Sequence, residues 1–252
     1  MLLTQSFREV PVAGPTICCI GTFDGVHRGH RHLIGSAVRE ARLRDMQAAV
    51  VTFYPHPRAV LRGVEERYLS LPDEKAVLVS DLDVDVMLVH AFTPDTIQTR
   101  ADEFTRWMLE AFDMRSLWIG PDFAFGHQRE GNVDWLRRAG DRYGFAVNVV
   151  DQYVVDGRPS SSSRVRDSLL RGDMQDVTTC LGRTYAISAQ LAEDGRHLHL
   201  DARRFWPTPG EYAVTVHGKP NRIFLSPTDG ADGLLEQIIY SEPYSVVQVN
   251  FA

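Results

Sequence analysis

The chain has 252 residues, of which 44% are hydrophobic, with a formal net charge of −6 and a pI near 5.8. This length and composition predict a globular protein with a substantial core, either one large domain or a domain with a small appendage. The acidic balance argues against a general nucleic-acid binder or a protein of anionic membrane surfaces, because either needs a basic face.

Three cysteines, Cys18, Cys19 and Cys180, form no CxxC pair, so the pattern indicates neither disulfides nor structural zinc. Residues 1–11 show no basic start followed by an apolar stretch, and no apolar run approaches membrane-spanning length. We therefore expect a soluble, cytoplasmic protein without a targeting segment and without membrane or nucleic-acid partners. The sequence leaves the oligomeric state open.

A short apolar run, residues 16–20, predicts a strand buried on both faces of a parallel sheet. Apolar residues at three- and four-residue intervals then predict a helix from about His27 to Met46. The turn between them ends at a helix N-terminus, where unpaired N–H groups and the macrodipole favour an anion. His27 and His30 share a face there, and imidazoles can donate to phosphate oxygens. The plainer alternative is two surface histidines; a metal site that adds His32 is disfavoured, since His32 points off that face.

Strands and helices continue to alternate through the first 183 residues. This spacing predicts an α/β fold with a doubly wound parallel sheet and right-handed crossovers. Further strands are expected at residues 48–53, 84–89, 115–120 and 145–150, and helices at 72–82, 99–112, 132–143, 167–172 and 173–182.

Three loops carry residues that a ligand site could use. Phe53 precedes Pro55-His56-Pro57, a stretch that is equally compatible with a rigid turn and with a ligand loop. The segment Asp122-Phe123-Ala124-Phe125-Gly126 follows a strand and could be ordinary loop packing. Four serines, residues 160–163, precede Arg166 and by themselves indicate a helix N-cap and a linker.

Beyond residue 183 the sequence becomes rich in alternating and β-branched residues, at 197–200, 212–216 and 245–251. We predict a small antiparallel barrel or sheet there, and hence two domains, residues 1–183 and 184–252. His197 and His199 share one strand face, for which a solvated edge is preferred over a metal pair.

The spacing Gly21-x-Phe23-Asp24-Gly25-x-His27-x-Gly29-His30 resembles the nucleotide-binding signature of HxGH-type nucleotidyltransferases. Its Asp-Gly version is similar to the FAD synthetase module of bacterial bifunctional riboflavin kinase/FAD synthetases. The Pro-His-Pro stretch, the Asp122–Gly126 segment and the serine run match further motifs of that family in the same order, so that the resemblance covers about residues 10 to 183. Ser160, with Pro159 before it, stands where the family has an apolar residue.

The resemblance implies transfer of AMP from ATP to FMN, giving FAD and pyrophosphate, with Mg²⁺ held by substrate phosphates and not by dedicated protein ligands. It implies His27, His30 and Arg166 as catalytic residues. The implied ATP-binding residues are Gly21, Thr22, Phe23, Asp24, Gly25, Gly29, Ser161, Ser162 and Ser163. The implied flavin-binding residues are Phe53, Pro55, His56, Pro57, Asp122, Phe123, Phe125 and Gly126.

Two other functions stay open: a related adenylyl- or cytidylyltransferase acting on another phosphorylated acceptor, and a non-catalytic nucleotide- or flavin-binding protein. The tail keeps the family's kinase-domain start at residues 182–185, but residues 191–206 contain no glycine-rich phosphate loop. The sequence also ends just after a strand, where such kinases carry a terminal helix. We therefore predict a degenerate riboflavin-kinase-like barrel without kinase activity, kept for packing or assembly.

Overall fold

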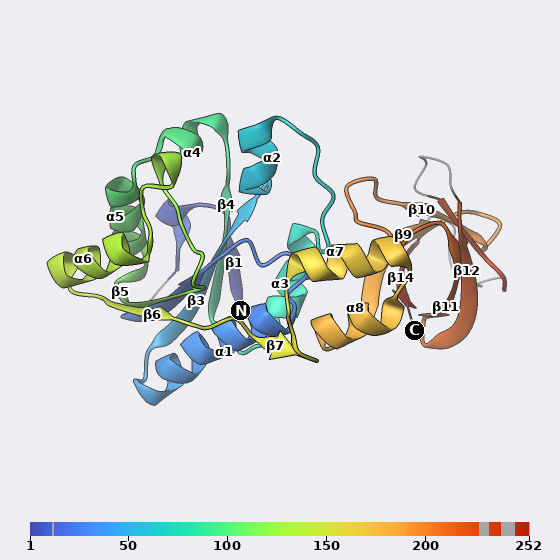
Figure 1. Ribbon diagram of the computed structural model, residues 1–252, viewed down its shortest axis with the longest axis horizontal. Coiled ribbons are helices and arrows are strands. Elements are labelled where there is room, and N and C mark those ends of the chain that lie inside the picture. The colour runs from blue at the N-terminus through green and yellow to red at the C-terminus, as the bar shows by residue number, and fades with distance from the viewer. Residues whose placement is uncertain (12, 227–231, 238–244, 252) are drawn as a thin grey trace. The chain divides into compact units, whose positions relative to one another are not determined.

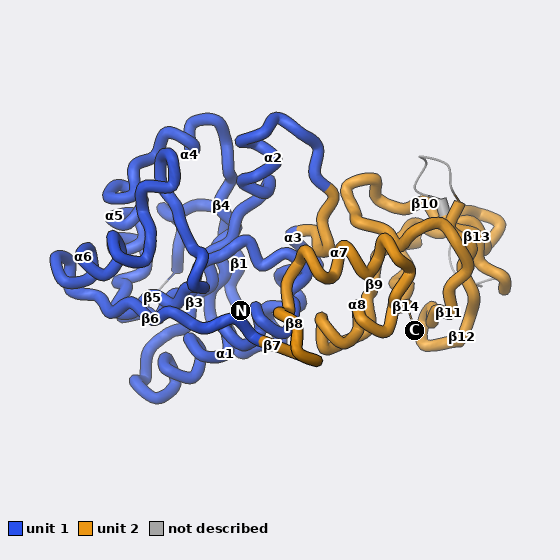
Figure 2. The backbone as a smooth tube through the Cα atoms, in the orientation of Figure 1, with its two compact units in different colours: residues 1–66, 72–153 blue, residues 67–71, 154–252 orange. Residues whose placement is uncertain are grey.

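The computed structural model describes residues 1–11, 13–226, 232–237 and 245–251. The contacts group the chain into two compact units (Figure 2): unit 1 comprises residues 1–66 and 72–153, and unit 2 comprises residues 67–71 and 154–252. Residues 154–183 therefore pack with the tail. The predicted boundary at residue 183, which marks where the family resemblance ends, stays a prediction.

Unit 1 is built on a parallel sheet of six strands in the order β1-β4-β3-β2-β5-β6 (Figure 1). All five predicted strands are present, and β1, which sequence reasoning missed, pairs with β4 at the edge. The strands are β1 (Leu2–Thr4), β2 (Thr16–Ile20), β3 (Gln47–Tyr54), β4 (Val86–Ala91), β5 (Met114–Ile119) and β6 (Ala146–Val149).

Helices cover both faces of this sheet, which confirms the doubly wound fold. Ile17 and Cys19 of β2 bury against α1, whereas Cys18 and Ile20 face the core that α5 and α6 form. The helices of unit 1 are η1 (Phe7–Glu9), α1 (Arg28–Leu43), α2 (Pro57–Arg62), α3 (Pro72–Ser80), α4 (Pro94–Gln98), α5 (Ala101–Phe112), η2 (His127–Arg129) and α6 (Val133–Tyr143).

The order of strands reverses at β2. From β2 the chain runs outward through β3 to β4, and it then crosses to the other side of β2 to form β5 and β6. The loop after β2 therefore lies at a topological switch point, and open α/β sheets bind ligands outside the carboxyl ends of their strands at such points.

Unit 2 contains a helical hairpin and a closed antiparallel barrel of six strands in the order β10-β13-β12-β11-β14-β9. The barrel confirms the predicted antiparallel β region. Besides the two-stranded β7 (Val154–Val155) and β8 (Arg158–Pro159), its elements are α7 (Ser162–Arg171), α8 (Met174–Leu181), β9 (Tyr185–Leu191), β10 (His197–Leu200), β11 (Gly210–Val216), β12 (Lys219–Leu225), β13 (Asp232–Leu235) and β14 (Val246–Phe251).

One boundary in unit 2 was predicted wrongly. Helix α7 begins at Ser162 and not at Asp167, so Ser162, Ser163 and Arg166 lie within the helix and not in a linker before it. Within the described part of the chain, no helix is both long enough and apolar enough to cross a bilayer.

Candidate active site

The loop between β2 and α1 is held in an unusual conformation. Phe23 and Val26 have φ values of 46° and 39°, and both side chains are buried. Non-glycine residues in this left-handed region cost roughly 1–3 kcal/mol each, so the surrounding packing must impose the turn. Gly21 permits it, since a Cβ at that position would lie 3.0 Å from the Phe23 ring.

His27 and His30 come together where this loop becomes α1. His27 is the N-cap, and its Nδ1 accepts a hydrogen bond of 3.3 Å from the His30 backbone N–H. The two rings stack with centroids 3.6 Å apart, and Phe23 packs edge-on to His30. The structure thus joins both predicted histidines to the positive end of a helix.

The His30 ring differs from its neighbour in its bonding. Its Nδ1 is buried and has no hydrogen-bond partner among the described residues. Burial, with smaller contributions from His27 and from Lys75, lowers the pKa of His30 well below its ordinary value. The ring is therefore neutral at pH 7, and its one N–H group can donate a hydrogen bond to an anion.

Lys75 lies behind the loop and was missed by sequence reasoning. It is 4% exposed on α3, and its Nζ donates to the Thr22 carbonyl at 2.7 Å and to Thr52 Oγ1 at 3.2 Å. Burial lowers the pKa of Lys75 to about 8, while the charge of Asp24 opposes that shift. The sequence offered one signal: Lys75 stands four residues before Val79, which is buried, and therefore on the same face of the helix.

A pocket of about 570 Å³ opens at the carboxyl end of the sheet in unit 1. Its volume lies within the usual range of roughly 300–1,000 Å³ for small-molecule sites. Gly21 and Thr22 of the motif loop line it together with most of the predicted flavin-binding residues. Those residues are Phe53, His56, Pro57, Asp122, Phe123, Phe125 and Gly126.

The wall formed by residues 122–131 is a closed loop. Phe125 and Gly131 exchange two backbone hydrogen bonds, of 2.9 and 3.0 Å, and Phe123 stacks on Phe125 with ring centroids 5.5 Å apart. Gly126 has a φ of 74°, and a Cβ there would lie 2.7 Å from the Ala101 backbone nitrogen. The glycine thus lets this loop close against α5, which fixes the two aromatic rings at the pocket.

The Pro-His-Pro stretch turns out to begin a short helix that sequence reasoning missed. His56 is the N-cap of α2, and its Nδ1 accepts from the Arg58 backbone N–H at 3.1 Å. His56 therefore fixes the turn at the start of α2 and also lines the pocket. Arg58 and Arg62 of α2 line the pocket as well, which gives this acidic protein a local positive charge.

The predicted phosphate-binding serines and arginine lie on α7, in unit 2. Ser161 caps the helix by accepting from the Arg164 N–H, and Ser162 and Ser163 occupy its first turn. The guanidinium of Arg166 lies 5.8 Å from the centre of the Phe205 ring and donates to the Arg67 carbonyl at 3.5 Å.

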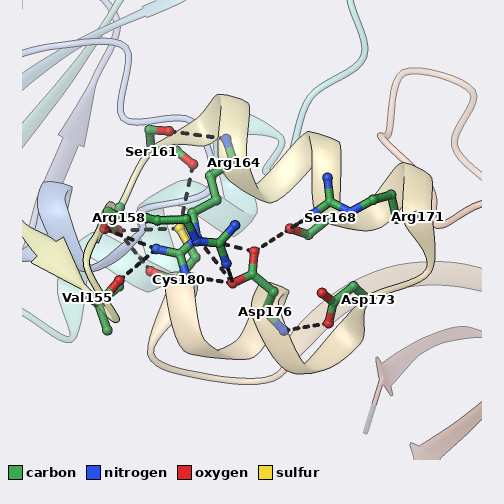
Figure 3. Close-up of polar contacts among 10 residues, drawn as sticks. Val155, Arg158, Ser161, Arg164, Ser168, Arg171, Asp173, Asp176 and Cys180 are labelled. Carbon is green, nitrogen blue, oxygen red and sulfur yellow. Dashed lines mark hydrogen bonds and ion pairs between the residues drawn. The ribbon is translucent and has the colours of Figure 1, made fainter.

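Helix α7 is tied to α8 by a buried ion pair (Figure 3). Arg164 donates to Asp176 at 2.6 Å, and Ser168 donates to the other carboxylate oxygen at 2.6 Å. The hydrogen bond from Arg164 is the main reason that the pKa of Asp176 falls to about 2. Ser160, the departure from the family pattern, is buried and donates to the Cys180 carbonyl at 3.0 Å, so its hydroxyl is satisfied.

The structure thus gathers the predicted residues into distinct groups. In unit 1, the loop with its two histidines and the aromatic pocket meet at Gly21 and Thr22, while Pro55 is not among the residues that line the pocket. In unit 2, the serines and Arg166 share one helix. The described residues contain no cluster of three or more His, Cys, Asp or Glu side chains suited to a metal ion.

Comparisons with known proteins agree with these motifs. Residues 10–164 match the model of the family described as FAD synthetase. A bifunctional riboflavin kinase/FMN adenylyltransferase of Haemophilus influenzae is 31% identical over 217 residues, which cover 81% of this chain and 70% of that protein. The protein of the same name from Escherichia coli is 31% identical over 225 residues, covering 85% and 72%. The one from Listeria monocytogenes is 31% identical over 189 residues, which cover 74% of this chain and 58% of that protein.

A solved structure has the same fold. The crystal structure of a macrolide-efflux protein from Streptococcus pneumoniae matches 100% of this chain and 90% of its own with a TM-score of 0.84, at 20% sequence identity. At that identity the likeness concerns the fold alone. The family model, in contrast, spans more than half of the sequence, and relatives over 30% identical are covered for more than two thirds of their length. The chain therefore belongs to the FAD synthetase family.

Proposed function

We propose that the chain transfers AMP from ATP, entering as its magnesium complex, to the phosphate of FMN, and that FAD and pyrophosphate are the products. The observation that carries the proposal is the meeting of two features at Gly21 and Thr22. A helix N-terminus with two histidines, suited to an anion, follows the same loop that lines an aromatic pocket. The names of the curated relatives include FMN adenylyltransferase, which supports the same reaction.

The reaction requires little proton transfer by the protein. A phosphate monoester is largely dianionic at pH 7, because its second pKa is about 6, so the attacking oxygen needs no general base. That oxygen forms a bond to the α-phosphorus of ATP in line with the bond to the β-phosphate oxygen, which breaks and releases pyrophosphate. Catalysis then consists of positioning and of stabilising negative charge.

The proposed roles follow from the donors that each group offers. The N–H groups at the start of α1, with His27 and His30, stabilise charge on the α-phosphate. Ser162, Ser163 and Arg166 hold the β- and γ-phosphates, because hydroxyls and a guanidinium fork suit phosphate oxygens. Phe53, Phe123 and Phe125, with the Pro-His-Pro stretch and Asp122, bind the flavin ring, for which aromatic walls are the natural partner.

A related transferase with another acceptor is the second candidate, since the histidine loop recognises the nucleotide and not the acceptor. The aromatic lining of the pocket favours a flavin over a small aliphatic phosphate. A non-catalytic binding protein is the third candidate.

The test is to incubate the purified protein with ATP, Mg²⁺ and FMN and to measure FAD and pyrophosphate in equal amounts. Parallel reactions replace FMN by nicotinamide mononucleotide, or ATP by CTP with glycerol 3-phosphate as acceptor. FAD formation only with the first pair is expected. Turnover only with another acceptor supports the second candidate, and flavin binding without turnover in any reaction supports the third.

A further inference from the structure

Lys75 is an uncommon residue in an uncommon place. The chain contains 27 lysines and arginines, and only Lys75 and Lys219 are lysines. Lys219 is exposed on β12, whereas Lys75 is buried. Lysine is almost never fully buried unless it has partners, so the partners of Lys75 indicate its role.

Those partners form a closed triangle of hydrogen bonds in unit 1. The Thr22 carbonyl accepts from Lys75 Nζ at 2.7 Å and from Thr52 Oγ1 at 3.0 Å, and Lys75 Nζ also donates to Thr52 Oγ1 at 3.2 Å. Thr22 directly precedes Phe23, whose left-handed backbone starts the turn towards the histidines. Thr52 directly precedes Phe53, which lines the aromatic pocket. The Lys75 ammonium therefore bonds to the residue before Phe23 and to the residue before Phe53.

Charged and titratable groups face this ammonium from two directions. Asp24 lies on the motif loop and His30 on α1, and each interacts electrostatically with Lys75. The positive charge of Lys75 adds to the burial that lowers the pKa of His30. Lys75 thus influences the backbone of the loop and the protonation of one of its histidines.

We propose that Lys75 is a positioning residue for the transfer reaction: by holding the Thr22 carbonyl, it fixes the histidine loop against the aromatic pocket. The proposal rests on the proposed adenylyl transfer. A purely structural role explains the choice of lysine poorly, because a buried charge loses its hydration, whereas a neutral donor could also bond to a carbonyl and a hydroxyl.

The test compares Lys75→Met, Lys75→Gln and the control Lys219→Met in the full-length protein. Methionine keeps the length and removes the donor and the charge, and we expect kcat to fall about 10- to 100-fold, the loss that fits one hydrogen bond from a charged group. The thermal midpoint should fall as well, because the change leaves the buried Asp24 without the positive charge that faces it. Glutamine keeps an N–H donor and should recover part of kcat, and Lys219→Met should match the wild type.

A pH profile supplies a readout that a structural role would not change. Burial lowers the pKa of Lys75 to about 8, and a neutral amine donates more weakly than an ammonium, so kcat/KM of the wild type should decline above about pH 8. His30 stays neutral throughout this range, because its pKa is lowered. The variant Lys75→Gln should lack the decline. In protein labelled with ¹³C at lysine Cε, the two lysines give two signals, so the titration of Lys75 can be followed directly.

The outcomes separate this proposal from the proposed function. Two results would overturn the role of Lys75. One is wild-type kinetics in Lys75→Met. The other is a fall in both kcat and the thermal midpoint of Lys75→Met, with no recovery of kcat in Lys75→Gln. If Lys75→Met does not fold, the wild-type and Lys75→Gln pH profiles decide, and identical profiles contradict the role. Absence of FAD in the wild-type reaction contradicts adenylyl transfer itself.

Discussion

At the scale of single residues, the two histidines of the motif are placed differently although they stack. His27 uses Nδ1 to cap α1, while His30 keeps a buried Nδ1 without a partner among the residues that the structure describes. His27 therefore contributes to the helix start as well as to the proposed site, and His30 has no such bond through its side chain. This difference predicts different consequences when each is replaced.

We expect His30→Ala to lower kcat for FAD formation by about 10²–10³, the usual effect of removing one preorganised donor to a developing anion. His27→Ala should lower kcat less but should also destabilise the protein, because a lost N-cap costs about 1 kcal/mol. His27→Asn keeps a capping side chain and separates the two effects. The measurements are steady-state kinetics and thermal unfolding, and unchanged turnover in the His27→Ala/His30→Ala double variant would rule out both assignments.

At the scale of elements, α7 presents two arginines with opposite environments. Arg164 is buried and bonds to Asp176, whereas Arg166 is half-buried and lies against Phe205, a residue of the segment between β10 and β11. The helical period places the two side chains on different faces although they are only two positions apart. One helix thus carries a structural arginine and a candidate phosphate ligand.

For Arg166→Ala we expect a higher KM for ATP and weaker inhibition by pyrophosphate, with flavin binding nearly unchanged, because a guanidinium fork suits phosphates and not an isoalloxazine ring. Arg164→Ala is the matched control: it should lower stability, since it removes the buried partner of Asp176 and leaves that carboxylate only Ser168 and the more exposed Arg158. Isothermal titrations with ATP and FMN provide the comparison. Equal losses of both affinities in Arg166→Ala would contradict the assignment.

The same ion pair predicts how acid affects unit 2. Chiefly through the hydrogen bond from Arg164, the pKa of Asp176 is about 2 in the folded state, below its unfolded value of about 3.9. A lowered carboxylate pKa contributes stability above the unfolded pKa, here about 2 kcal/mol at pH 7, and this is lost as the pH falls from about 4 towards 2.

Urea unfolding of the wild type and of Asp176→Asn at pH 7 and pH 3 measures this contribution. The difference in the free energy of unfolding between the two proteins should shrink at pH 3. A difference that is the same at both pH values would show that the charge of Asp176 contributes nothing.

The inner strands β2, β3 and β4 were predictable because each contains a continuous apolar run, as burial on both sheet faces requires. Short elements were not, since β1 and α2 have three and six residues and too few positions to show a period. The start of α7 was misplaced because a run of serines is typical both of a linker and of a helix cap. Lys75 was missed for another reason: its role depends on Thr22 and Thr52, which are distant in the sequence.

At the scale of the whole molecule, an overall charge of −6 coexists with local positive charge among the residues of the proposed site. Arg58, Arg62 and Arg129 line the aromatic pocket, and Arg166 lies on α7 beside the serines. Net charge argues against a general polyanion binder but carries no information on a site for single nucleotides. Local sequence spacing predicts such a site, because the motifs indicate where helix N-termini and hydrogen-bond donors lie.

The segment between β10 and β11 bonds to other parts of unit 2. Arg204 is buried and donates to the Leu69 and Ala186 carbonyls, and the Phe205 N–H donates to the Tyr68 carbonyl at 2.9 Å. Residues 67–71 are thereby bonded to the tail within unit 2. This segment serves internal packing with long side chains, which differs from a loop that offers bare backbone N–H groups to a ligand.

We accordingly predict that the protein forms no FMN from riboflavin and ATP. The family's kinase domains carry a Gly-Phe-Pro-Thr-Ala-Asn segment, whose small residues let backbone N–H groups approach a phosphate. Here the tail has Asp201-Ala202-Arg203-Arg204-Phe205-Trp206-Pro207-Thr208 before β11, in which Arg203 pairs with Asp201 and Thr208 donates its N–H to the Leu169 carbonyl. These groups bond within the fold, and the segment lacks the small residues that would let its backbone approach a phosphate.

The assay incubates riboflavin, ATP and Mg²⁺ with the protein and separates riboflavin, FMN and FAD by chromatography. Two controls use the same preparation: added FMN should become FAD, and an added riboflavin kinase should allow FAD to form from riboflavin. Both together show that the transferase is active and that only the phosphorylation step is missing. FMN or FAD made from riboflavin by the protein alone, and lost when Arg204 or Thr208 is replaced, would show that this barrel binds nucleotide after all.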